Sequence, residues 1–389
     1  LPPKDAELFS TVCQFCIVGC GYKVYKWPEG RDGDATPKGN AFGLDFTKQQ
    51  PAFGSWVPPL AHSVITQSDG RYNIVIIPDE DASVNSGMAS VRGAGLAASL
   101  YRPDGPTKSR LSTPMVRTSS GAKATNWDEA TELGGRVIKA VMEHWGADAV
   151  GMKFFDHGGG GGGFENNWAV GRFFFDGIQT QSVSIHNRPA YNSEIHAASD
   201  AGIAPLTNAY VDAQLADTIV IVGANPYETQ TNYFLNHMIK NLSGESISTK
   251  ENFFSKEEFD TGRMIVIDPR RTMTVATAEA AAGSENILHL QLEPGSDLWL
   301  LNAIARVIYD RKWHDIGFIQ NRTEVQTWEA YQRSTLMSGQ SSEEFLNEAS
   351  MKSGIAISDI IKAAEWIAKP KASRIARRTL FHYEKGLIW

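Results

Sequence analysis

The sequence is poor in cysteine, in long apolar runs and in basic clusters. Only three of its 389 residues are cysteine, so a fold held together by several disulfide bonds is excluded. No apolar stretch reaches the ~18–20 residues needed to span a bilayer. Lys and Arg number 37 against 44 Asp and Glu, and no basic stripe or block occurs. This charge pattern argues against nucleic acid as a partner.

The composition that is present is that of a globular protein. Hydrophobic residues make up 42% of the chain, which is enough for real cores, and the length predicts two or three domains at ~100–200 residues each. The chain has no initiator Met, its first residues do not form a signal peptide, and it stops just after a strand-like run at 379–383. We therefore expect a fragment of a longer protein, with residues missing at both ends.

The three cysteines form one motif, Cys13-x2-Cys16-x3-Cys20. An odd number leaves one thiol over in any disulfide scheme, and a bridge between such close neighbours closes too small a loop to stabilise much. Thiolates clustered on a short loop suit a soft metal centre, above all an iron–sulfur cluster. A zinc site lacking its fourth ligand and three ordinary thiols are the alternatives. Without a fourth cysteine, a four-iron cluster held by four cysteines is excluded, whereas a 3Fe-4S cluster needs only three.

The remaining pattern predicts alternating strands and helices. Residues 1–112 are rich in turns, with short strand-like runs such as 72–77. A helix is expected over 126–144, because Asn126 and Glu129 resemble a capping box and apolar residues follow at helical spacing. Further strands are expected at 149–155, 182–185, 218–222, 264–267 and 287–292, and helices at 165–176, 192–199, 227–241, 297–311 and 358–368. This alternation predicts an α/β fold with a parallel sheet covered on both faces.

Residues able to bind a ligand follow several of these strands, where parallel sheets bind ligands. His157 and the six glycines 158–163 follow the first run, and their bare amides could approach a large anionic cofactor. A surface loop is the alternative. The joins 223–232, 268–272 and 293–297 follow later strands and carry amide, acidic and Arg side chains. An acid can accept from a ribose or a guanine edge, and Arg can hold phosphate, although each join can also be only a cap or a turn.

The joins that follow the later strands lack two common nucleotide-binding motifs. None of the joins 223–232, 268–272 and 293–297 matches G-x-G-x-x-G or the Walker P-loop, so NAD and ATP are poorly supported as ligands.

The order of the motifs carries a more specific resemblance. After the cysteines come Ser90-Val91-Arg92-Gly93, Gly-Ala-Asn-Pro at 223–226, Asp-Pro-Arg-Arg-Thr at 268–272 and Pro-Gly-Ser-Asp at 294–297. This order resembles the molybdopterin oxidoreductases of the DMSO reductase superfamily. Within them, the chain looks like the N-terminal half of the large catalytic subunits of the arsenite oxidase family, and the resembling segments are 13–22, 155–168, 185–194, 225–237 and 383–389.

The resemblance implies cofactors and domains. It implies molybdenum with two molybdopterin guanine dinucleotides, and a 3Fe-4S cluster on the three cysteines with Ser90 in the fourth, non-ligand position. It places Arg92 between cluster and pterin. It assigns cofactor binding to His157, Gly158, Gly159, Asn225, Glu228, Asp268, Arg271, Thr272, Gly295, Asp297 and Lys385. It implies an iron–sulfur domain over 1–115, then parallel-sheet, Rossmann-like α/β domains that are truncated: a first segment over 116–187 and a dinucleotide-binding domain over 188–389.

The segment 185–194 carries the implied substrate. Ala190 stands where other superfamily members present a side-chain ligand to molybdenum, so the resemblance implies an open metal face. His186 and Glu194 match residues of the arsenite pocket; a satisfied strand-end His and an exposed helix acid are the alternatives. The implied activity is oxidation of arsenite to arsenate in the periplasm. Electrons then pass through the cluster to a small Rieske 2Fe-2S subunit and on to a cytochrome c or cupredoxin.

Two other functions stay open at this point. A related molybdenum enzyme of reversed direction, such as an iodate reductase, shares the serine beside the cluster. A protein of a different class, an electron-transfer subunit that has lost molybdenum, would keep the same fold.

Overall fold

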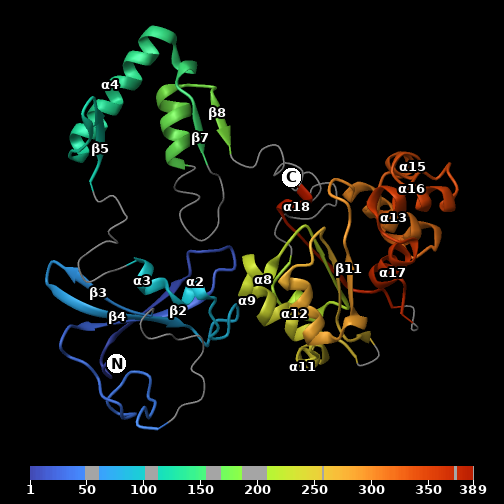
Figure 1. The fold of residues 1–389 in the computed structure, drawn as a ribbon, viewed down its shortest axis with the longest axis horizontal. Helices are drawn as coiled ribbons and strands as arrows, with labels where there is room; N and C mark the ends of the chain where they lie inside the picture. The colour runs from blue at the N-terminus through green and yellow to red at the C-terminus, as the bar shows by residue number, and fades with distance from the viewer. Residues whose placement is uncertain are drawn as a thin grey trace. The chain divides into compact units, whose positions relative to one another are not determined.

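The computed structural model describes residues 1–48, 61–100, 113–154, 168–185, 208–255, 258–371 and 375–388. The chain divides into two compact units, Leu1–His196 and Ala197–Trp389, and each is described in turn (Figure 1). The domain boundaries expected after residues 115 and 187 stay predictions.

The first unit begins with an antiparallel sheet in the order β1-β2-β4-β3. Its strands are β1 (Glu7–Val12), β2 (Gly21–Pro28), β3 (His62–Gln67) and β4 (Gly70–Pro78). Tyr25, Trp27, Val75 and Ile77 are buried together in one core cluster. The short helices α2 (Val91–Ala94) and α3 (Leu96–Leu100) pack against β3 and β4. Residues on both faces of β4 are therefore buried.

The rest of the first unit is a hairpin, a long helix and a pair of parallel strands. The hairpin joins β5 (Met115–Thr118) to β6 (Gly121–Ala124), and it leads into α4 (Trp127–Trp145). The predicted helix at 126–144 is confirmed, and the Asn126 side chain accepts a hydrogen bond from the Glu129 amide as its cap. Strand β7 (Met152–Phe154) pairs in parallel with β8 (Val183–Ile185).

Two predictions in this region were only partly right. The strand expected from residue 149 begins at Met152, because Ala147–Ala149 form the 3-10 turn η1. The described part of the helix expected at 165–176 includes the π-helix η2 (Gly171–Ile178), which ends at Gln179 in the left-handed region with φ of 63°. The helix expected at 192–199 lies outside the described residues.

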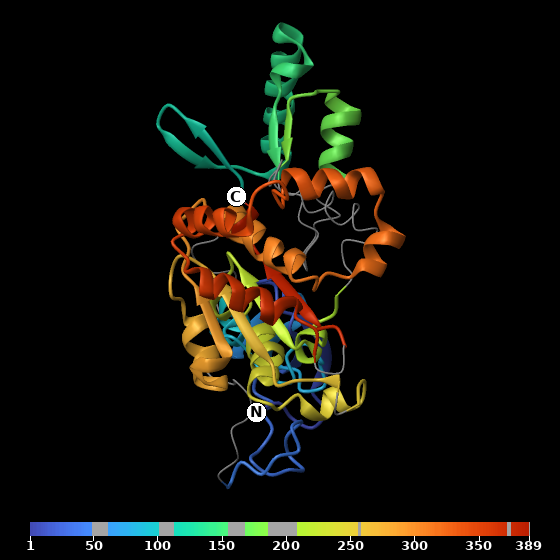
Figure 2. The ribbon, with the colours of Figure 1, turned by 90° about the vertical axis from the view of Figure 1, so that its right-hand side faces the viewer.

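The second unit is built on a four-stranded sheet in the order β11-β10-β9-β12. The strands are β9 (Thr218–Val222), β10 (Arg263–Ile267), β11 (Ile287–Leu290) and β12 (Thr379–Tyr383), and every pair is parallel. In Figure 2 the red β12 lies beside the yellow-green β9, although their sequences are far apart. The predicted parallel sheet is confirmed.

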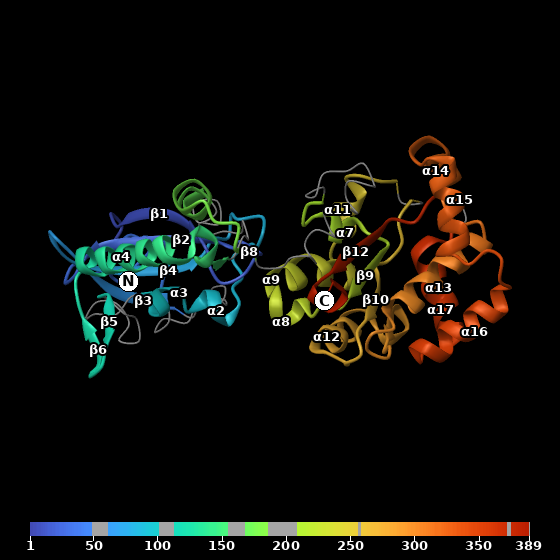
Figure 3. The same cartoon turned by 90° about the horizontal axis from the view of Figure 1, so that it is seen from above.

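Helices cover both faces of this sheet. Val220, Ile265 and Leu290 belong to one core cluster with helices α13 (Asp297–Asp310), α16 (Ser342–Ser353) and α17 (Ile357–Ala368). Helices α8 (Pro226–Thr229) and α12 (Met273–Ala282) lie on the opposite side of the strands (Figure 3). Ile219 and Met264 are fully buried as well, so the central strands β9 and β10 have no solvent-facing side, whereas the edge strand β12 leaves Phe381 and Tyr383 exposed.

The helices expected at 297–311 and 358–368 are confirmed, but the one expected at 227–241 is broken. Gln230 has φ of −140° and ψ of 47°, which are not helical angles. Helix α8 therefore ends before it, and a new helix begins after it. The pieces after it are α9 (Thr231–Tyr233), the π-helix η3 (Phe234–Ile239) and α10 (Lys240–Leu242). The remaining short elements are α7 (Asp212–Leu215), α11 (Ile247–Glu251), η5 (Ser284–Asn286), α14 (Ile316–Arg322), α15 (Val325–Ser334) and α18 (Lys385–Ile388).

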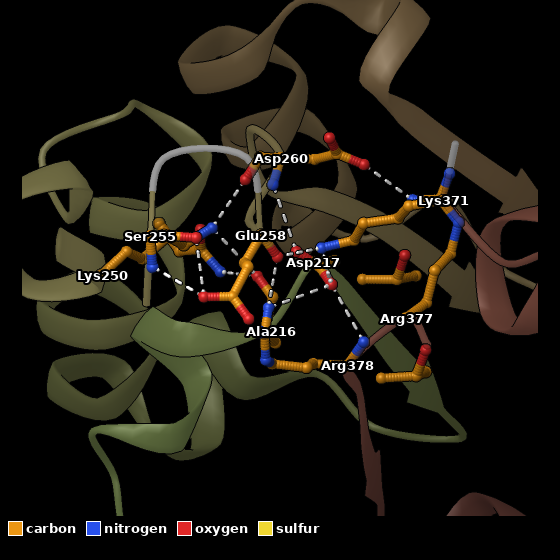
Figure 4. Close-up of polar contacts among 12 residues, drawn as sticks. Ala216, Asp217, Lys250, Ser255, Glu258, Asp260, Lys371, Arg377 and Arg378 are labelled. Atoms are coloured by element: carbon orange, nitrogen blue, oxygen red, sulfur yellow. Dashed lines mark hydrogen bonds and ion pairs between the residues drawn. The ribbon is translucent and has the colours of Figure 1, made fainter. Parts of the chain in front are cut away.

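A buried charged network holds the amino-terminal edge of the parallel sheet (Figure 4). The fully buried Asp217 carboxylate lies 2.7 Å from Lys371 Nζ and accepts hydrogen bonds from the backbone amides of Arg378 at 2.9 Å and Asp260 at 3.2 Å. Lys250 donates to the Asp260 carbonyl at 2.8 Å, and burial lowers the pKa of Lys250 to about 8. The network lies opposite the carboxyl edge, where such sheets bind ligands, so we assign it a structural role.

Over the described ranges, none of the helices combines the length and the apolar character needed to cross a membrane.

Candidate cluster and cofactor sites

The three cysteines lie on the loop that connects β1 to β2. The Cys13 amide donates to the Cys20 carbonyl at 2.9 Å, which clips the two ends of the loop together. Gly19 has a φ of 68°, which a side chain would disfavour, so this position suits glycine. Cys13 and Cys20 are buried, Cys16 is half-buried, and none of the three is in a disulfide bond. One short loop therefore carries all three thiols.

The Ser90 motif packs against this cysteine loop. Ser90 is the N-cap of α2, and its hydroxyl accepts a hydrogen bond from the Gly93 amide at 3.4 Å. A Cβ added at Gly93 would lie 3.6 Å from Cys13 Sγ and 2.1 Å from the Tyr22 hydroxyl. Only glycine fits there, and the Ser90 hydroxyl is engaged by its own helix.

Burial and neighbouring charges determine the electrostatics of the loop. Burial raises the pKa of the Cys13 thiol, and the nearby Cys16 adds to that effect. The Phe15 backbone amide and the positive charge of Arg92 act in the opposite direction on that pKa. Arg92 therefore lies within electrostatic reach of the cysteine loop, and it favours a thiolate there.

Asn85 is a positioning residue that the sequence did not reveal. It is fully buried, and its side chain accepts from the Gly21 amide at 2.8 Å and donates to the carbonyls of Gly21 at 3.1 Å and Met88 at 3.0 Å. It thereby ties the end of the cysteine loop to the segment that leads into Ser90. Nothing in its local sequence distinguishes it from an ordinary turn residue.

The donor set fits an iron–sulfur cluster. Within the residues that the structure describes, no three or more His, Cys, Asp or Glu side chains converge on one metal ion. A cluster takes its thiolates at different irons, so its ligands need not converge on a single point. The Tyr22 hydroxyl beside the loop is buried and has no hydrogen-bond partner among the described residues. Three cysteines outside any disulfide and one unpaired hydroxyl match a cluster whose sulfurs accept hydrogen bonds.

The parallel sheet gathers the expected cofactor-binding loops at one edge. Asn225 and Glu228 follow β9, the segment 268–272 follows β10, the segment 295–297 follows β11, and Lys385 follows β12. Because all four strands are parallel, these loops share the carboxyl edge of the sheet. The structure therefore brings the dispersed motifs to one side of the second unit.

The strand order reverses at β9, where the loops after β9 and β12 meet. Gly386 donates its amide to the Gly223 carbonyl at 3.0 Å. Gly223 has φ of 58°, and a Cβ there would lie 2.4 Å from the Leu387 amide nitrogen. A Cβ on Gly386 would lie 2.6 Å from the Gly223 carbonyl oxygen. Both glycines permit this crossing at a topological switch point, where open α/β sheets bind ligands.

Thr272 supplies the strongest sign of a ligand at this edge. It is the N-cap residue of α12 and only 5% exposed, yet its hydroxyl caps no amide and pairs with no other residue in the described ranges. A buried polar atom at a helix N-terminus suits an anion such as a phosphate group. Asn225 is held nearby by a 2.7 Å hydrogen bond from Thr274.

The other candidate residues at the edge are more exposed or otherwise engaged. Arg271 forms an ion pair with Glu279 on α12, so its guanidinium is already paired with a side chain of that helix. Asp268 accepts a hydrogen bond from the Arg270 amide at 2.8 Å. Helix α13 begins at Asp297, one residue after its N-cap Ser296. The exposed candidates are Glu228, Arg271 and Gly295, and the half-buried ones are Asn225, Asp268 and Asp297.

Six of the expected site residues lie outside the described residues, and their roles stay predictions. They are His157, Gly158, Gly159, His186, Ala190 and Glu194.

Comparison with known proteins gives two matching families. A family described as Rieske 3Fe-4S matches residues 13–107, and one described as molybdopterin oxidoreductase matches residues 110–364. The first covers the cysteine loop and Ser90, and the second covers most of the parallel sheet.

Individual relatives match the chain over most of its length. Arsenite oxidase subunit AioA of Herminiimonas arsenicoxydans is 43% identical over 390 residues, covering 100% of this chain and 46% of the relative. Iodate reductase subunit IdrA of Denitromonas iodatirespirans is 32% identical, covering 100% and 43%. Acetylene hydratase from Pelobacter acetylenicus shares the fold with a TM-score of 0.53 and 14% identity, over 97% of this chain and 40% of that one. The chain thus spans less than half the length of these relatives.

Proposed function

Because the chain belongs to the molybdopterin oxidoreductase family, we propose that the protein it comes from oxidises arsenite to arsenate. The observation that carries the proposal is the clipped loop with three cysteines outside any disulfide, packed against the segment that begins with the helix-capping Ser90. This arrangement occurs in a chain that is 43% identical along its whole length to an arsenite oxidase subunit.

The cysteine loop is the electron exit in this proposal. Cys13, Cys16 and Cys20 hold a 3Fe-4S cluster, and Ser90 leaves the fourth position without a ligand. The positive charge of Arg92 acts on Cys13 and would favour the electron-rich state of a bound cluster, which agrees with the position between cluster and pterin that the family resemblance implies for it.

The carboxyl edge of the parallel sheet holds the anionic ends of two molybdopterin guanine dinucleotides. The buried hydroxyl of Thr272 and the amides that begin α12 would hold phosphate, and Asp268 and Asp297 would accept hydrogen bonds from the guanine or ribose groups. His157, Gly158, Gly159, Asn225, Glu228, Arg271, Gly295 and Lys385 complete the set. When bound, this cofactor supplies the oxygen transfer and two-electron chemistry that arsenite oxidation needs.

The segment 186–194 provides the substrate pocket. Arsenite is mostly neutral near pH 7, so its pocket needs hydrogen-bonding groups rather than charge. His186 and Glu194 hold the arsenite hydroxyls by hydrogen bonds, and Ala190 leaves the molybdenum face open to substrate. A cluster held by the three cysteines would pass the two electrons one at a time to a small Rieske subunit and then to a periplasmic cytochrome c or cupredoxin.

Iodate reduction is the second candidate, because an iodate reductase subunit is also similar along the whole chain. The two are separated by assaying the full-length protein with its small subunit, once with arsenite and an oxidised dye and once with iodate and a reduced dye. We expect kcat/KM for arsenite to exceed that for iodate by at least about a hundredfold, or ~2.7 kcal/mol. A reversed preference would favour the iodate reductase. Iron without molybdenum in the purified protein would favour an electron-transfer subunit.

A further inference from the structure

Tyr22 carries a buried hydroxyl that the proposed function does not use. The residue lies on β2, two positions after Cys20, and is 1% exposed. No described residue pairs with its hydroxyl. Buried hydroxyl groups in folded proteins are almost always paired, so the position calls for an acceptor that the described part of the chain does not provide.

The surroundings of this hydroxyl show where such an acceptor would lie. The Tyr22 hydroxyl and Cys13 Sγ both lie within 4 Å of one point, the position that a Cβ on Gly93 would occupy. These distances place the hydroxyl beside both Gly93 of α2 and the Cys13 thiol.

We propose that Tyr22 donates a hydrogen bond from its hydroxyl to a sulfur atom of the cluster held by the three cysteines, and so raises the reduction potential of the cluster. This inference rests on the proposed cluster. When one electron enters, the negative charge on the cluster increases, and a hydrogen bond donated to its sulfur offsets part of that charge. The hydrogen bond therefore stabilises the reduced form more than the oxidised form.

The position of Tyr22 also explains why residue 93 is glycine. A methyl group there would overlap the Tyr22 hydroxyl at 2.1 Å, while the ring carbon that bears the hydroxyl lies at 3.1 Å. The absence of a side chain at Gly93 therefore leaves the space that the Tyr22 phenol occupies. Removing the hydroxyl removes the severest part of that overlap.

The first test is Tyr22→Phe in the full-length protein, followed by redox titration of the low-temperature EPR signal of the oxidised cluster. We expect the signal to remain and the ratio of reduced to oxidised cluster at a fixed potential to fall about tenfold, which is a midpoint about 59 mV lower for a one-electron couple. Tyr25→Phe is the matched control, because Tyr25 is buried on the same strand but packs against Phe42 in the core cluster. Its midpoint should equal that of the wild type.

The second test uses the overlap between a side chain at position 93 and Tyr22, and then a more acidic hydroxyl at position 22. Gly93→Ala should lower cluster content, and adding Tyr22→Phe to it should restore part of that content. If Tyr22→Phe fails to hold a cluster, Tyr22→3-fluorotyrosine keeps the size of the ring with a more acidic hydroxyl, and it should raise the midpoint.

The outcomes separate the two proposals. Absence of a cluster signal in the wild type would overturn the proposed cluster itself. A normal wild-type signal, with a midpoint that neither Phe nor 3-fluorotyrosine at position 22 shifts, would overturn only the role of Tyr22 and leave it as a packing residue.

Discussion

Truncation of Asp217 should open the amino-terminal edge of the parallel sheet. Its carboxylate is fully buried and connects segments that are distant in sequence, since the Arg378 amide that donates to it is 161 positions away. The Asp217→Ala variant leaves the Lys371 ammonium and the amides of Arg378 and Asp260 without their acceptor. Breaking a buried pair in this way typically costs about 3–5 kcal/mol.

The expected loss can be worked from these contacts. Each buried amide left without a partner costs about 1–3 kcal/mol, while Lys371 keeps the Glu258 carbonyl as a second acceptor. We therefore expect a total of about 3–5 kcal/mol for Asp217→Ala and less for Lys371→Met, which leaves both amides satisfied. The double variant should be milder than the sum of the two by about 1–3 kcal/mol, because the pair is in direct contact.

Hydrogen exchange by mass spectrometry measures this change locally in the full-length protein. Peptides that contain β9 and β12 should exchange at least about a hundredfold faster in Asp217→Ala, because about 1.4 kcal/mol is a factor of ten. Lys369→Met is the matched control, since its pair with Glu365 at 3.3 Å is exposed and should contribute at most about 0.5 kcal/mol. Equal exchange in Asp217→Ala and Lys369→Met would refute the structural role of the network.

Three further predictions concern the cluster, the pocket and acid stability. Ser90→Cys places a thiol at the fourth position, so we expect a four-iron cluster and loss of the oxidised-state EPR signal; an unchanged signal would count against this. His186→Ala and Glu194→Ala should each lower kcat/KM for arsenite by at least about tenfold with the cluster signal intact, whereas wild-type kinetics at normal molybdenum content would make both residues structural. Burial lowers the pKa of His382 to about 4, against about 6.5 when unfolded. The unfolded state therefore binds more protons between these values, and stability falls by up to about 3 kcal/mol as the pH drops from about 6.5 to 4. Urea midpoints should show a shallower acid loss in His382→Phe, and equal slopes would contradict the assignment.

The sequence predicted the parts of the fold that depend on local pattern. Strands β9, β10 and β11 are short apolar runs bounded by turn residues, and α4 has a side-chain cap at Asn126, so periodicity and capping were sufficient. Helix α12 was missed because its alanines give it no apolar stripe, although the sheet buries Val275 and Ala278. The break at Gln230 was missed because the apolar spacing continues through it.

In the candidate site, too, the sequence predicted what depends on neighbouring residues and missed what depends on distant ones. The cysteine motif is readable because its ligands are neighbours in sequence, and the family prediction that rested on the order of the motifs is confirmed. The contacts of Tyr22 with Gly93 and of Asn85 with Gly21 join residues more than sixty positions apart. These contacts form only when the strands pair and the helices pack, so no local sequence pattern predicts them.

The most direct measurement is iron analysis with low-temperature EPR of the oxidised, separated large subunit. The account predicts three iron atoms for each molybdenum and a signal that is present when the cluster is oxidised and disappears on reduction. Four irons in the cluster, a signal that appears only on reduction, or a cysteine loop without iron would contradict it.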